Sequence, residues 1–233
     1  MGGASSLESL DIEGLTDASL TNRENATLGV AYGENEVTQG CNFTPTQSAT
    51  APAVKWTLEG NDDKKYTLIC TDPDAPDREG HAYREFIHWV RSDISGASLA
   101  SGTIDGTDNL PYVGPGPPYN SGDHRYIFLL FEQPAEGYNL ESLVAAFEGR
   151  GGKKAAVAAK AAGLGDIVAI SVFISSWDES VDALHESLGF LPPPEFRSPK
   201  QQAANPPAEA AAATDAAAAP PAEEEPPAAA GDA

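Results

Sequence analysis

The sequence predicts a mainly β protein of the α+β class, an antiparallel β-sandwich whose helices are gathered near the C-terminus. Three observations support this. Four short segments have the apolar or alternating pattern of strands, regular helices do not separate most of them, and helical patterns cluster in the last part of the ordered sequence. Hydrophobic residues make up 41% of the 233-residue chain, enough for one sizeable core.

The expected strands are Tyr66–Cys70, Phe86–Ile94, His124–Gln133 and Val168–Trp177. The first ends at a dense turn signal, DPDAP at 72–76. The third has an unbroken apolar middle, which is typical of a central strand buried on both faces. The fourth is rich in β-branched and aromatic residues.

Three helices are expected towards the end of the domain. The first is Asn139–Gly149, with Asn139 as its N-cap, and the second is Lys153–Ala162, ended by Gly163. The third starts near residue 178 and stops at residue 189. Its expected apolar face is formed by Val181, Leu184 and Leu188.

The composition changes sharply after Arg197. Residues 1–197 are expected to form one domain. Residues 198–233 contain Ala, Pro and Glu in abundance and no aromatic residue, and pairs of prolines interrupt the Ala runs. This segment is predicted to be a disordered acidic tail, which serves either as a solvated spacer or as an interaction arm.

The charge balance restricts the partners. Lys and Arg number 14 against 35 Asp and Glu, a net charge of −21, which repels nucleic acid and anionic membrane surfaces. Recognition of a lipid would therefore need a specific pocket. No apolar run reaches the roughly 20 residues of a transmembrane helix. Neither cysteine has metal-ligand spacing, so neither a metal nor a cofactor is expected.

The N-terminal sequence and the cysteines predict a cytoplasmic protein. The first residues lack the basic and apolar regions of a secretory signal, and Cys41 and Cys70 form no disulfide framework. Residues 1–6 fit the pattern for myristoylation of Gly2, and the sequence leaves open whether that glycine is modified.

No standard catalytic template is present: the chain lacks a G-x-S-x-G elbow, an H-E-x-x-H pair and a Walker loop. His88 and His124 lie near loops rich in Pro and Asp, the expected rim of a cavity. Taken singly, each histidine could be structural, and DPDAP could be two overlapping turns. No nucleophile is evident beside them.

Four blocks in order carry a family resemblance: TDPDAP at 71–76, YREFIHWV at 83–90, YVGPGPP at 112–118 and GDHRYIFLLFEQ at 122–133. Together they strongly resemble the phosphatidylethanolamine-binding family, which includes Raf-kinase inhibitor proteins, plant flowering regulators and the fungal carboxypeptidase Y inhibitor. The resemblance covers roughly residues 20–190. It implies a large antiparallel sheet packed on smaller elements, with a small pocket at one end.

The resemblance also implies the pocket's residues. They would surround a phosphate or the phosphorylethanolamine head group of a phospholipid, and a cis bond is expected before Pro76. Phe86 and His185 stand where animal members carry Trp and Tyr, which leaves the lipid preference open. The full predicted set is Asp72, Asp74, Pro76, Tyr83, Phe86, His88, Gly116, Pro118, His124, Tyr126 and His185.

The expected function is that of a non-enzymatic binding protein that holds such an anion and acts as a signalling regulator. Its protein partner, a kinase, protease or adaptor, is not identified by the sequence. One alternative is inhibition of a serine carboxypeptidase. A weaker one is a phosphoester hydrolase that uses His88 and His124.

Overall fold

The structure is a computed structural model that describes residues 10–15, 26–57, 63–80 and 82–205. Its nine strands form two sheets. The smaller has the order β2-β1-β4, from Asn35–Glu36, Gly29–Tyr32 and Ala53–Lys55. The larger has the order β3-β9-β8-β5-β6-β7, from Cys41–Asn42, Ile167–Ser175, His124–Gln133, Lys65–Asp72, Phe86–Ser95 and Thr107–Leu110.

The sheet pairing is antiparallel as expected, except that β3 runs parallel to β9. All four predicted strands are present as β5, β6, β8 and β9. The described helices are Gly96–Ser101 (α1), Leu140–Ala146 (α2), Ala155–Ala161 (α3), Ser180–Ser187 (α4) and Pro199–Ala204 (α5), with a 3₁₀ turn at Pro194–Phe196. The fold is therefore mainly β with a few helices.

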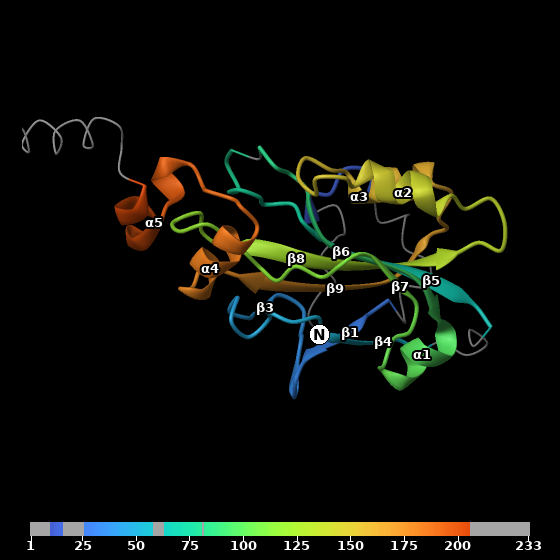
Figure 1. The fold of residues 1–233 in the computed structure, drawn as a ribbon. Coiled ribbons are helices and arrows are strands. Elements are labelled where there is room, and N and C mark those ends of the chain that lie inside the picture. The colour runs from blue at the N-terminus through green and yellow to red at the C-terminus, as the bar shows by residue number, and fades with distance from the viewer. Residues whose placement is uncertain (1–9, 16–25, 58–62, 81, 206–233) are drawn as a thin grey trace, which may run out of the picture.

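Both faces of the large sheet are buried, which explains the unbroken apolar middle of β8. Tyr126, Phe128 and Leu130 point into a core shared with the small sheet. Ile127 and Leu129 alternate with them and point into a second core, which α2 and α3 cover. Figure 1 shows these helices on one face of the sheet and β1, β4 and α1 on the other.

The predicted helices are α2, α3 and α4. Asn139 caps α2 as expected, accepting a hydrogen bond from the Ser142 amide. The sequence analysis missed α1, because its six small residues are too few to show an apolar period. On α4, Val181 is buried, but Leu188 follows the helix and its side chain is 48% exposed, so the expectation of an apolar face was wrong there.

The boundary after Arg197 needs correction. Ser198 is buried and caps α5 through a capping box with Gln201, so the ordered domain continues to Asn205. The rest of the expected tail, 206–233, lies outside the described residues, as does Gly2.

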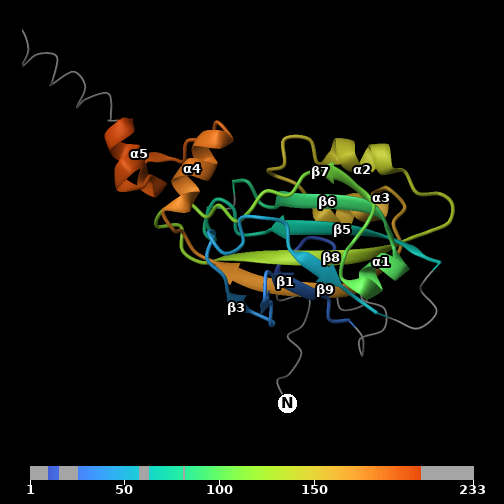
Figure 2. The same ribbon diagram turned by 60° about the horizontal axis from the view of Figure 1, so that its bottom comes forward.

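Figures 1 and 2 both place α4 and α5 at one end of the large sheet. Among the described residues, no helix is long and apolar enough to cross a membrane.

Candidate functional site

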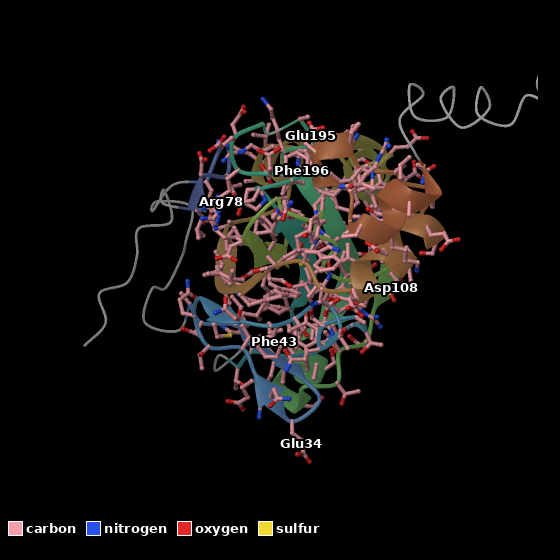
Figure 3. All side chains as sticks on the ribbon, turned by 90° about the vertical axis from the view of Figure 1, so that its left-hand side faces the viewer. Glu34, Phe43, Arg78, Asp108, Glu195 and Phe196 are labelled. Atoms are coloured by element: carbon pink, nitrogen blue, oxygen red, sulfur yellow. The ribbon has the colours of Figure 1, made fainter. Side chains whose placement is uncertain are left out.

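A cavity of about 330 Å³ lies at the end of the sheet where β5 stops and β6 and β8 begin. Antiparallel pairing brings these three strand ends together. Ten of the eleven predicted residues line it: Asp72, Pro76, Tyr83, Phe86, His88, Gly116, Pro118, His124, Tyr126 and His185. The peptide bond between Ala75 and Pro76 is cis, as the resemblance implied. Figure 3 views the molecule from this end, with Glu34 and Phe43 on the small-sheet side and Phe196 opposite.

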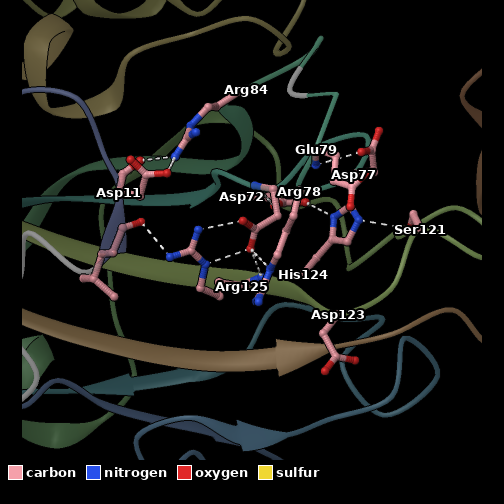
Figure 4. Close-up of polar contacts among 12 residues, drawn as sticks. Asp11, Asp72, Asp77, Arg78, Glu79, Arg84, Ser121, Asp123, His124 and Arg125 are labelled. Carbon is pink, nitrogen blue, oxygen red and sulfur yellow. Dashed lines mark hydrogen bonds and ion pairs between the residues drawn. The ribbon is translucent and has the colours of Figure 1, made fainter.

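A hydrogen-bonded chain runs through Asp72, His124 and Ser121 (Figure 4). Asp72 Oδ2 accepts from His124 Nδ1 over 2.8 Å, and its Oδ1 accepts from the Asp74 amide over 2.7 Å. His124 Nε2 lies 3.0 Å from Ser121 Oγ, which donates to the Pro118 carbonyl over 2.8 Å. The chain ties the start of β8 to both the DPDAP turn and the loop at 116–122.

The hydrogen bonds around His124 favour its protonated form. When Ser121 gives its one hydroxyl proton to the Pro118 carbonyl, its oxygen can accept from a protonated Nε2 while Nδ1 donates to Asp72. Burial alone would lower the pKa of His124, but the charge and hydrogen bond of Asp72 outweigh it and raise the pKa above its ordinary value.

The three side chains lie in the order of a Ser-His-Asp triad, and sequence reasoning overlooked Ser121 as a neighbour of His124. In a catalytic triad the neutral imidazole accepts the serine proton. Here the serine donates to the Pro118 carbonyl and not to the ring, so this arrangement does not activate Ser121 as a nucleophile.

Tyr126 brings an unpaired donor to the cavity. The residue is 1% exposed, and its hydroxyl makes no hydrogen bond of ordinary geometry with any residue that the structure describes. The Gly116 amide is near enough to lower its pKa, yet burial dominates and raises the pKa well above the ordinary value. The side chain therefore stays a neutral phenol, and a buried phenol without a partner is costly unless a ligand supplies one.

His88 and His185 are neutral members of the wall. His88 Nδ1 donates to the Val113 carbonyl over 2.8 Å, and His185 Nε2 donates to the Gly116 carbonyl over 3.0 Å. Burial lowers the pKa of both rings. Their hydrogen bonds hold the 113–116 loop against β6 and α4.

Arg150 is a lining residue that sequence reasoning missed. Its guanidinium donates to the carbonyls of Ile87, His88 and Pro111 at 2.9, 3.1 and 2.8 Å. Among the described residues, no carboxylate forms an ion pair with it. The wall therefore carries a positive charge that no neighbouring carboxylate neutralises. An arginine in a glycine-rich stretch, GRGG at 149–152, was the available signal.

Asp74 does not line the cavity, unlike the other predicted residues. Its carboxylate accepts from Arg125 Nε and a terminal nitrogen over 2.8 and 2.6 Å, and from the Arg125 amide over 2.9 Å. Arg125 also donates to the Leu10 carbonyl over 3.0 Å. The assignment of Asp74 to the pocket is corrected: the side chain turns away from the cavity and ties the N-terminal segment to β8.

The mouth of the cavity is apolar. Tyr83 and Leu188 line it and are 44% and 48% exposed, and the Tyr83 ring meets Phe190 edge-on at 6.2 Å. Within the described ranges, no group of three or more His, Cys, Asp or Glu side chains could hold a metal ion. The site thus combines a polar floor, a cation and an apolar rim.

Comparison with known proteins identifies the family that the four sequence blocks resemble. A family model described as phosphatidylethanolamine-binding protein matches residues 19–169. The curated rice protein (Oryza sativa subsp. japonica) "Protein MOTHER of FT and TFL1 homolog 2" is 38% identical over 108 residues, which are 46% of this chain and 58% of that relative. The chain thus spans little more than half of the relative's length.

Two solved structures share the fold. One, described as carboxypeptidase Y inhibitor complexed with its cognate proteinase, has a TM-score of 0.55 and 25% identity, covering 66% of this chain and 84% of the other. The other, a phosphatidylethanolamine-binding protein from Plasmodium vivax, has a TM-score of 0.57 and 23% identity, covering 76% and 100%.

Proposed function

We propose, because this chain belongs to the phosphatidylethanolamine-binding protein family, that its cavity binds a small anion of the phosphate or phosphorylethanolamine type. The observation that carries the proposal is the Tyr126 hydroxyl, which is buried and unpartnered in the cavity wall. A phosphate oxygen accepts the hydrogen bond that this hydroxyl lacks.

The charges of the wall support an anion. The Arg150 guanidinium has no carboxylate partner among the described residues, and the raised pKa of His124 favours its charged form. Asp72 is the one carboxylate among the residues that line the cavity, and His124 already pairs with it. An anion at Tyr126 therefore meets net positive charge. The apolar rim fits the carbon atoms of an attached alcohol or lipid.

The test compares two buried tyrosines with unpaired hydroxyls. Tyr126→Phe removes the donor in the cavity. Tyr66→Phe removes the equivalent group from the core, away from the cavity, and is the matched control. Titration calorimetry with inorganic phosphate and with phosphorylethanolamine should show a roughly tenfold loss of affinity for Tyr126→Phe alone. Equal affinities for wild type and both variants would refute the proposal.

We further propose that the protein acts as a cytoplasmic regulator and not as an enzyme. The family that the chain resembles includes signalling regulators, and both cysteines are free thiols. Ser121 donates to the Pro118 carbonyl and not to His124, so it is no activated nucleophile for a hydrolase that uses His88 and His124. In an esterase and phosphatase screen, wild type should show no more turnover than Ser121→Ala.

Inhibition of a serine carboxypeptidase is the second candidate, favoured by the similarity to the inhibitor–proteinase complex. The N-terminal segment would supply much of the contact. Carboxypeptidase assays with the full chain and with a chain lacking residues 1–22 separate the two functions. Inhibition that depends on residues 1–22 supports this candidate, and absence of inhibition by the full chain removes it.

A further inference from the structure

Two buried polar side chains join the C-terminal helix α5 to α4. Ser198 Oγ donates to Asp182 Oδ2 over 2.5 Å, and the two residues are 1% and 7% exposed. The other oxygen of Asp182 accepts from Trp177 Nε1 over 3.4 Å. In the part of the chain that the structure describes, no lysine or arginine forms an ion pair with Asp182. The serine therefore faces a carboxylate that no cation neutralises.

The same serine is coupled to the wall of the cavity. Ser198 and Gln201 exchange two hydrogen bonds of 3.1 Å. Gln201 Nε2 donates to His185 Nδ1 over 3.3 Å, and His185 Nε2 donates to the Gly116 carbonyl over 3.0 Å. His185 and Gly116 both line the cavity. Displacing Ser198 would displace Gln201 and remove one of the two partners that orient His185.

We propose that Ser198 is a phosphorylation site at which a proline-directed protein kinase loosens this wall. The sequence Ser198-Pro199-Lys200 provides the proline after the hydroxyl. The kinase transfers the γ-phosphoryl group of ATP: an Oγ–P bond forms, the bond between the γ-phosphorus and ADP breaks, and the hydroxyl proton passes to the kinase's catalytic base. Apart from its cap, α5 buries none of its six residues, so local opening exposes Ser198 at low cost.

Phosphorylation would prevent α5 from returning to its place. The hydroxyl proton that bonded Asp182 is gone, and a group of nearly two negative charges would have to lie against a carboxylate in a space with no room for it. The release of α5 follows from this repulsion alone. The effect on anion binding rests on the proposed function of the cavity.

The first experiment treats the full chain with a proline-directed kinase and ATP and maps the phosphopeptides. The chain contains two Ser/Thr-Pro sequences, and the other, at the exposed Thr44, is the internal control for kinase activity. Phosphate on Ser198, absent from Ser198→Ala, is the expected result. Phosphate on Thr44 with none on Ser198 would overturn the proposal.

The second experiment measures backbone hydrogen exchange in the phosphoprotein, in Ser198→Glu and in the control Thr44→Glu. The Gln202 and Asn205 amides, which are bonded within α5, should exchange roughly tenfold faster in the first two only. Adding Asp182→Asn to Ser198→Glu should restore part of the protection, because it removes the repulsion but neither the lost cap nor the larger side chain. Unchanged exchange on phosphorylation would overturn the proposal.

The third measurement is titration with inorganic phosphate. The phosphoprotein is expected to bind several-fold more weakly than the unmodified chain. If the unmodified chain does not bind phosphate, the proposed function of the cavity fails, while the hydrogen-exchange result still decides the role of Ser198.

Discussion

Asp72 and Asp74 lie two residues apart in one turn, both are buried, and they serve different regions of the molecule. Asp72 belongs to the cavity, where its partner is His124, a base that can lose its proton. Asp74 belongs to the tie between β8 and the N-terminal segment, where its partner is Arg125, a permanent cation. Figure 4 shows Asp72, His124 and Ser121 of the first network and Arg125 of the second.

The difference shows that burial of a carboxylate does not by itself indicate a functional site. Whether its partner is a histidine or an arginine is the more informative feature. An Asp–Arg pair with three hydrogen bonds is a fixed structural element. An Asp–His pair in a cavity wall changes with pH and can respond to a bound anion. Stability should therefore depend most on Asp74 and anion binding most on the Asp72 region.

The largest expected effect is that of Asp74→Ala. The substitution leaves Arg125, half-buried, without its carboxylate, and should lower the free energy of unfolding by about 3 kcal/mol. Urea unfolding measures this. Asp77→Ala, at a partly exposed position of the same loop, is the control and should change stability less, because Asp77 accepts only from the Glu79 and Gly80 amides. The affinity for phosphate should stay within about twofold of wild type, since Asp74 does not line the cavity. A loss of affinity as large as that of Tyr126→Phe would contradict the division into two regions.

A third buried carboxylate, Glu85, sharpens the comparison because it forms no ion pair with a lysine or arginine among the described residues. Glu85 accepts from Thr71 Oγ1 and the Ala155 amide, each over 3.2 Å, and burial raises its pKa from 4.5 to about 7. An acid whose pKa is raised on folding stabilises the protein fully below its ordinary pKa, and that contribution is lost as the pH rises through the folded value.

Glu85→Gln keeps an oxygen for both donors and removes the charge. At pH 8 it should raise the free energy of unfolding by about 2 kcal/mol, and at pH 4 it should change little. Urea unfolding at the two pH values measures the difference. A variant that is equally stabilised or destabilised at both would show that the Glu85 carboxyl is not the titrating group.

The Asp72–His124 pair should show a smaller effect that also declines as pH rises. The folded pKa of His124 is raised, so the pair's contribution is complete below about pH 6.5 and is lost as the pH rises through the folded pKa. Asp72→Asn should reduce this loss, so the fall in the free energy of unfolding between pH 6 and pH 9 should be smaller in the variant than in wild type.

Anion binding should weaken over the same pH range. Sulfate is the suitable probe because its charge does not change there. In calorimetric titrations wild type should lose sulfate affinity between pH 6 and pH 9, and Asp72→Asn should lose less of it. Equal pH dependence in the two proteins would mean that His124 does not supply the titrating charge.

The strands were predicted from local patterns, and the ten cavity residues were implied by the family resemblance of the sequence blocks. β8 shows its burial on two faces as a continuous apolar run, and the blocks around Asp72 and His124 are contiguous in sequence. The pattern DPDAP does not say which carboxylate faces the cavity, since that depends on Arg125, far along the chain. Arg150 was missed because its partners are backbone carbonyls, and the glycine-rich stretch around it does not specify which carbonyls these are.

The C-terminal boundary gives the smallest effect and the last test. Composition placed the end of the domain at Arg197, although SPKQ at 198–201 is itself a capping-box sequence. A chain ended at Arg197 loses the Ser198–Asp182 bond and should be less stable by about 1 kcal/mol. A chain ended at Asn205 keeps these contacts and should match the full chain within about 0.5 kcal/mol. Thermal unfolding of the three chains distinguishes the two boundaries. If both truncated chains unfold at the same temperature as the full chain, α5 does not stabilise the fold, and the boundary at Arg197 is the better one.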